Sequence, residues 1–548
     1  MKQTRLLAIL LSIVMLLTFV AGCNKDGTNT PTNSTSPETS QNVSGSTSPS
    51  GTSPESTQNT TGSSESSSRE SITIALSADG GTLSPAHCSG DNMRICLLVQ
   101  EPLWDMLADG TVIYLLAESV DINGPDYWTL HLRKGVTFSN GNPFTASDVL
   151  FTLQVTKDSG IGTPRINNVD VERSYASDDY TVELYWPAYH DAAWQGLSDV
   201  MIYDEESYDI GTASSSPIGT GPYVVSEYML NSHCNLERRD DYWGGLQQLK
   251  NINFRFVAET SQVVNALETG KIDIGPVASA DYDYVSKLPG FVVDRIYQGN
   301  FLSVGFAMNQ SSAFYNNKEA RYAVAHAIDK QAILDLVYYG YGRVLNGPNT
   351  ELNINFDPAY NNAHSTYSTG YDLDVARQYA ESSGLAGKEI TIITTSTPAL
   401  LAASEMIQNM LKDINVNAVV NAYDSASIRQ LSYDPNSTYD MSVSLGINPA
   451  LCYQGPLING IVYNPVTSAG GWDRCEEFLE NCMAGWNTFD DTERAKAVKW
   501  IVDTYVDECL VYGLVDIQFC YAYRDDIKVF PPFKVQMNFR YQNMEFND

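Results

Sequence analysis

The sequence predicts a mixed α/β protein with more than one hydrophobic core. The chain has 548 residues, about three to four times the commonest domain size. From about residue 71 onward, segments with the apolar period of a strand alternate with segments that have the period of a helix, which is typical of mixed α/β architecture. No fixed-period repeat is visible, so we expect neither a solenoid nor a propeller.

Alternating apolar residues predict the strands. They occur at residues 72–76, 128–132, 182–185 and 252–256, each with the period of two that a half-buried strand needs.

Helical spacing of apolar residues predicts the helices. Thr145 and Asp148 form the S/T-x-x-D pattern of a capping box, so a helix should begin there. Gly270 and Gly340 each follow an apolar helical pattern and should end it. The further helices are expected at residues 321–339, 371–383, 400–414 and 492–506.

The charge balance excludes some classes of function. Lys and Arg number 33 against 65 Asp and Glu, a formal net charge of -32. A general nucleic-acid binder needs basic clusters for phosphate contacts, and a protein that binds a membrane surface electrostatically needs a polybasic segment. We therefore expect no nucleic-acid partner.

The N-terminus has the features of an export signal. Lys2 and Arg5 precede an uncharged run over residues 6–20, which as a helix would span about 22 Å, short of a bilayer core of about 30 Å. The sequence thus predicts a signal peptide over residues 1–22, with a transmembrane anchor as the weaker alternative. The run ends in VAGC, which resembles a bacterial lipobox and implies that Cys23 is lipidated. Ordinary cleavage beside an incidental cysteine is the alternative.

The next segment is expected to be a disordered tether, assigned to residues 23–70. Of the 47 residues 24–70, 24 are Ser or Thr and Val43 is the one aliphatic residue. Such a composition buries too little apolar area to offset its ordering entropy. A flexible coil of this length reaches about 40 Å, enough to hold a folded domain away from a lipid surface.

Cysteine spacing argues against a metal ribbon or a thioredoxin-like centre. Eight cysteines remain after Cys23, and no C-x-x-C pair occurs among them. Disulfides are possible outside the cell, but the pairing is left open. Buried thiols are an equal alternative, for example at Cys475 and Cys482 on a predicted helix.

Three sequence blocks point to a family. The first comprises residues 100–104 (QEPLW), 128–141 (WTLHLRKGVTFSNG) and 144–149 (FTASDV). The second comprises residues 217–223 (PIGTGPY) and 236–245 (LERRDDYWGG), and the third residues 318–330 (KEARYAVAHAIDK). Together they resemble the extracytoplasmic solute-binding proteins of family 5, the peptide- and nickel-binding components of ABC importers, from about residue 71 to the C-terminus.

The resemblance implies a two-lobed fold of the periplasmic-binding-protein type (type II, cluster C) with an extra subdomain inserted in lobe I. Two strands should cross between the lobes, near residues 301–308 and 510–519. The ligand should lie in the cleft between the two lobes. The expected parts are lobe I at 71–104, the inserted subdomain at 105–215, lobe I again at 216–305, lobe II at 306–510, and a return to lobe I at 511–548.

The second block contains a backbone device rather than a phosphate loop. Residues 219–222 (GTGP) lack the Lys-Ser/Thr and the following helix of a P-loop. We expect Gly219 and Gly221 to supply positive φ angles, and Pro222 to fix the exit into an extended segment.

The residues that line the cleft and contact the ligand are expected in lobe II. In peptide-binding members of the family, an aspartate there pairs with the α-ammonium group of the ligand. The matching stretch here, residues 439–453, has no carboxylate from Leu445 to Tyr453. Either another carboxylate substitutes, or the peptide is held through its backbone, or the ligand is not a peptide. The expected ligand-contacting residues are Asn448, Tyr453, Trp472 and Phe306, with plain packing as the alternative for each.

The function implied by the resemblance is non-catalytic. The chain would be a lipoprotein on the outer face of the cytoplasmic membrane that captures a peptide-like solute and delivers it to ABC permease subunits; an oligosaccharide is the alternative solute, and a role in sensing stays open. No cofactor is expected. The six histidines lack metal-ligand spacing, so no metal site is expected, although a bound metal chelate stays open. A tethered surface hydrolase is the competing class, but the G-x-S-x-G and H-E-x-x-H motifs are absent.

Overall fold

A computed structural model describes most of residues 69–547. The predicted signal peptide, Cys23 and the tether up to residue 68 lie outside the described residues. The chain divides into two units, residues 1–65 and 66–548, and all described residues belong to the second. Within them, no helix is long and apolar enough to cross a bilayer. The gaps between residues 69 and 547 are 89, 107–110, 125, 160–165, 167–168, 187–192, 309, 346–349, 352–369, 425–426, 429–430, 432–436, 448–471, 487, 489, 530–540 and 542–543.

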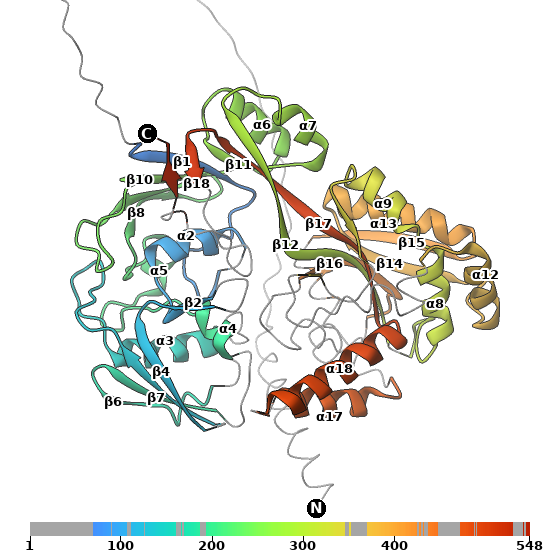
Figure 1. Ribbon diagram of the computed structural model, residues 1–548, viewed down its shortest axis with the longest axis horizontal. Coiled ribbons are helices and arrows are strands. Elements are labelled where there is room, and N and C mark those ends of the chain that lie inside the picture. The colour runs from blue at the N-terminus through green and yellow to red at the C-terminus, as the bar shows by residue number, and fades with distance from the viewer. Residues whose placement is uncertain are drawn as a thin grey trace, which may run out of the picture. The chain divides into compact units, whose positions relative to one another are not determined.

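A large mixed sheet runs through the described chain (Figure 1). Its strand order is β15-β14-β16-β12-β17-β11-β1-β10-β9-β8, and β13 pairs with β17 beside this path. The strands are β1 (Ser71–Leu76), β8 (Tyr223–Met229), β9 (His233–Arg238), β10 (Asn251–Phe256), β11 (Ile274–Val277), β12 (Phe291–Phe306), β13 (Gly342–Val344), β14 (Glu389–Thr395), β15 (Asn417–Tyr423), β16 (Met441–Ile447) and β17 (Val511–Arg524).

The alternating patterns correctly predicted strands in both sheets. Residues 72–76 and 252–256 form β1 and β10, which pair in parallel register. Residues 128–132 and 182–185 form β5 (Tyr127–Leu132) and β7 (Thr181–Tyr185) of a separate antiparallel sheet with the order β4-β5-β7-β6. The other strands are β4 (Ala117–Gly124), β6 (Tyr175–Asp178), β2 (Trp104–Met106), β3 (Val112–Tyr114), β18 (Ile527–Val529) and β19 (Glu545–Phe546).

The smaller sheet has its own core. Trp104, Trp128 and Trp186 are almost completely buried there, together with apolar residues of α3 (Ala146–Asp158). This helix begins where the capping box predicted, since the Thr145 backbone N–H donates to Asp148 Oδ2 at 2.8 Å. The residue limits expected for the inserted subdomain and the lobes stay a prediction.

One predicted helix is two. Residues 321–339 fall into α8 (Lys318–Ala327) and α9 (Lys330–Val337), because Ile328 has extended backbone angles. Asp329 then caps the second helix by accepting a hydrogen bond from the Ala332 N–H at 3.0 Å. The expectation of a single helix was wrong because the apolar pattern continues across the break.

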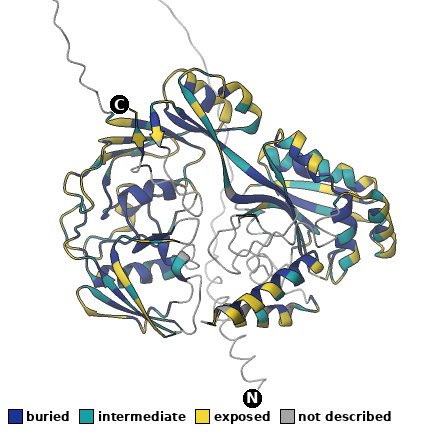
Figure 2. Cartoon of the chain, in the orientation of Figure 1, coloured by how far each residue is buried: buried dark blue, intermediate teal, exposed yellow. Residues whose placement is uncertain are grey.

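The remaining helices flank the sheets. Figure 2 shows α2 (Asn92–Val99) buried along its length, and every one of its residues is classed as buried. The others are α4 (Ala193–Ser198), α5 (Ile210–Ser215), α6 (Thr260–Glu268), α7 (Tyr282–Val285), α12 (Leu373–Ser382), α13 (Pro398–Lys412), α17 (Cys475–Trp486) and α18 (Asp491–Asp507).

The two glycines of the GTGP segment serve a different purpose from the one predicted. Neither Gly219 nor Gly221 is among the described glycines with positive φ, so that expectation was wrong. A Cβ atom on Gly219 would overlap the carbonyl oxygen of Val99, and one on Gly221 would lie 2.6 Å from that of Leu98. The Gly221 N–H also donates to the Val99 oxygen at 2.9 Å. Glycine is needed here because two backbones touch.

Candidate functional site

Two long strands, β12 and β17, belong to two hydrophobic cores at once. The first core lies around β1, α2 and β8–β10, and the second around α8, α9, α12, α13 and β14. In β17, Leu514 and Val515 are members of the second core, whereas Tyr521 and Tyr523 are members of the first. The described elements therefore form two lobes that β12 and β17 join (Figure 1).

The pairing of these strands is irregular between the two cores. Tyr297 pairs with Gln518 and Phe301 with Asp516, so three residues of β12 face a single residue of β17. Gly299, inside this irregularity, has a φ of 76°. A bulge bends a strand and breaks the regular ladder. This irregular segment, residues 297–301 of β12 and 516–518 of β17, is called the strand crossing below. It is where the two lobes are expected to rotate relative to each other.

A buried carboxylate lies at the strand crossing. Asp516 pairs in register with Phe301 on one side and with Arg343 of β13 on the other. Its side chain is fully buried, and its Oδ2 accepts from Arg343 Nε at 2.9 Å and lies 2.7 Å from Nη2. Arg343 also pairs with Glu351 at 2.5 Å and lies over the ring of Tyr297, 4.5 Å from its centroid.

Burial has the largest effect on the pKa of Asp516. It raises the pKa of this carboxyl from 3.8 to about 6, although the hydrogen bonds and charge of Arg343 oppose the shift. Asp516 Oδ1 is buried and has no hydrogen-bond partner among the described residues. A carboxylate held in this state is costly, and perturbed groups of this kind concentrate at functional sites.

The predicted ligand-contacting residues fall into two groups. Phe306 and Trp472 are 1% and 4% exposed and belong to the second core, where they pack against Phe314 and Phe478. Because both side chains are buried in this core, packing alone explains them. Ligand contact by either residue stays a prediction without structural support. Asn448 and Tyr453 lie outside the described residues, directly after β16.

The carboxylate nearest in sequence to that segment has a structural role. Asp440 Oδ1 accepts from the Ala313 N–H and its Oδ2 from the Thr391 N–H, both at 2.9 Å. Sequence reasoning missed Asp516 as a candidate; the available signal was one acid within the otherwise apolar run of β17.

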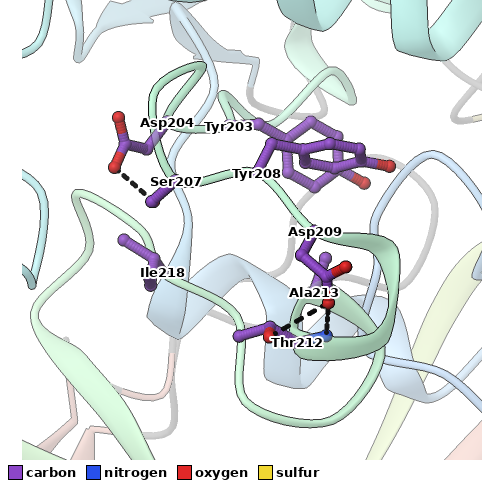
Figure 3. A pocket seen from close by; sticks show the side chains of 8 residues that line it. All are labelled: Tyr203, Asp204, Ser207, Tyr208, Asp209, Thr212, Ala213 and Ile218. Atoms are coloured by element: carbon purple, nitrogen blue, oxygen red, sulfur yellow. Dashed lines mark hydrogen bonds between the residues drawn. The ribbon is translucent and has the colours of Figure 1, made fainter.

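A small pocket lies elsewhere, beside α5 (Figure 3). Its carboxylates are already satisfied by the protein: Asp209 accepts from the Thr212 N–H at 2.9 Å, and Asp204 accepts from the Ser207 hydroxyl at 2.5 Å. No cluster of His, Cys, Asp and Glu suited to a metal ion occurs in the part of the chain that the structure describes. The pocket is lined by Tyr203, Asp204, Ser207, Tyr208, Asp209, Thr212, Ala213 and Ile218.

Comparison with known proteins identifies the class. The family model for bacterial extracellular solute-binding proteins, family 5, matches residues 111–450, which is more than half of the chain. The chain therefore belongs to this family, as its sequence blocks predicted.

Two individual relatives are each less than 30% identical to this chain. A di/tripeptide-binding protein of Pseudomonas aeruginosa is 29% identical over 348 residues, covering 56% of this chain and 63% of its own length. The nickel-binding periplasmic protein of Escherichia coli is 26% identical over 288 residues, covering 50% of this chain and 55% of its own. Both alignments thus span less than two thirds of the relative.

A solved structure shows the same fold over a larger part of the chain. The ABC transporter substrate-binding protein CtaP of Listeria monocytogenes superposes with a TM-score of 0.76 at 22% identity, and the match covers 88% of this chain and 100% of CtaP. This confirms the predicted two-lobed fold.

Proposed function

We propose that the chain is the solute-binding component of an ABC importer, anchored by lipid on Cys23 to the outer face of the membrane. The observation that carries this proposal is the strand crossing: β12 and β17 serve both cores, and their pairing breaks between them. Hinged lobes of this kind close around a ligand and release it chemically unchanged. Membership in a family of extracellular solute-binding proteins supports the same conclusion.

We propose a peptide-like solute as the first choice. The Pseudomonas relative is named for di- and tripeptides and the Escherichia coli relative for nickel, so a metal chelate is the strongest competitor, and an oligosaccharide is also retained. The solute would contact the segment after β16, where Asn448 and Tyr453 stand.

The proposal can be tested by thermal unfolding of the mature protein with a panel of ligands. We expect a short peptide at about 100 times its Kd to stabilise the protein by about 2.7 kcal/mol, and native mass spectrometry of protein from its own host to show a trapped peptide mass. A shift with nickel–histidine or with oligosaccharides alone would replace the peptide assignment. No shift with any class, or a ligand recovered cleaved, would contradict the function itself.

Two variants separate ligand contact from packing. Tyr453→Ala should weaken ligand binding while it leaves the unfolding temperature of the unliganded protein unchanged. Trp472→Ala should lower that temperature without ligand, because Trp472 is 4% exposed in the second core and its truncation costs about 3–5 kcal/mol. A Tyr453 variant that binds normally would remove this segment from the site.

A further inference from the structure

Two buried cysteines lie side by side in the first core. The Sγ atoms of Cys88 and Cys96 are 3.6 Å apart, and both residues are 0% exposed. Cys96 is in α2, whereas Cys88 closes the preceding turn, in which its N–H donates to the Ser84 oxygen at 2.8 Å. We propose that these two cysteines form an intrachain disulfide in the exported protein.

The geometry needs only a small adjustment. A disulfide has an S–S length of about 2.05 Å, so the two sulfur atoms must approach by about 1.5 Å in total, which modest side-chain rotations can supply. In the thiol form, Cys96 Sγ lies 3.2 Å from the Leu83 oxygen and Cys88 Sγ lies 3.1 Å from Met93 Sδ. Cys234, in the same core, is equally buried but has no such sulfur neighbour among the described residues.

The reaction balances with an external disulfide as oxidant. The two thiols lose two protons and two electrons as the S–S bond forms, and the oxidant, a disulfide of an oxidoreductase or oxidised glutathione, is reduced to two thiols. An extracellular protein meets such oxidants. Because both sulfur atoms are buried in the folded chain, oxidation must take place before the first core closes.

The bond would join two segments that reach different parts of the lobe. In the Cys88 turn, Ser84 Oγ lies 2.7 Å from the Tyr203 hydroxyl. From α2, Arg94 donates to the hydroxyl of Tyr521 on β17 at 3.3 Å. The disulfide would thus fix α2, which contacts Tyr521 of β17, against the turn that contains Cys88.

Tryptic mapping tests this directly, because cleavage after Arg94 separates the two cysteines. Residues 70–94 then contain Cys88 as their one cysteine, and residues 95–133 contain Cys96 as theirs. In mature protein secreted or refolded with oxidised glutathione, and alkylated without reductant, we expect the two peptides to be joined, with a mass about 2 Da below their sum. Both peptides alkylated separately, or either joined to another cysteine, would overturn the proposal.

Stability provides a second readout. Reductant present during refolding should lower the unfolding temperature of the wild-type protein, but not that of the Cys88→Ala/Cys96→Ala variant. Cys234→Ala is the matched control and should keep the dependence on reductant. If the double variant retains that dependence in full, the disulfide is not between these residues.

Discussion

Replacing Gly219 by alanine is expected to lower the free energy of unfolding by about 3 kcal/mol. The added Cβ would overlap the backbone oxygen of Val99, and backbone cannot move aside as a flexible side chain does. Two hydrogen bonds also hold the Gly219 oxygen in place, from the Ser139 N–H at 2.9 Å and from Arg239 Nη1 at 3.1 Å. Denaturant unfolding of the wild-type and variant proteins measures the loss.

Gly135 provides the matched control for this prediction. It has a φ of 77°, and a Cβ there would meet no atom within 4 Å. Gly135→Ala therefore isolates the cost of left-handed backbone, about 1 kcal/mol. Equal losses in the two variants would show that the close approach to Val99 does not explain Gly219.

Replacing Asp516 by asparagine is expected to change the pH dependence of stability. The folded-state pKa of about 6 lies above the ordinary 3.8, so the protonated Asp516 carboxyl contributes to the stability of the wild-type protein below about pH 4. This contribution is lost as the pH rises through 6. The asparagine is neutral at every pH. Between pH 4 and pH 7.5 the variant should therefore gain on the wild type by about 3 kcal/mol in free energy of unfolding.

The prediction concerns the difference in free energy of unfolding between the Asp516→Asn variant and the wild type. The pH-dependent contributions of the other acids are the same in both proteins and cancel in this difference. Glu351→Gln is the control, because it removes the exposed partner of Arg343 and keeps Asp516; its pH profile should stay close to that of the wild type. A constant difference between the Asp516→Asn variant and the wild type across this range would show that Asp516 is not held in an unfavourable charged state.

Local patterns were sufficient to predict much of the fold. The strands β1, β5, β7 and β10 and the start of α3 follow from alternation and capping within a few residues. Three sequence blocks were enough to identify the family.

Two of the three features that the sequence did not reveal are non-local. The reason for Gly219 is a contact with Val99, 120 positions earlier in the chain, and no local rule contains it. The break between α8 and α9 is hidden in a continuous apolar pattern. Asp516 acquires its unusual state from burial between β12 and β13, which depends on how distant strands assemble.

The most direct test is the distance between the two lobes with and without ligand. Unnatural amino acids at the exposed positions Leu246 and Leu336, which are 65% and 69% exposed, can carry a fluorophore pair for single-molecule energy transfer. We predict that a bound solute shortens this distance and that the original distribution returns once the solute is removed with its mass unchanged. One fixed distance in the presence of bound solute would contradict a hinged binding protein.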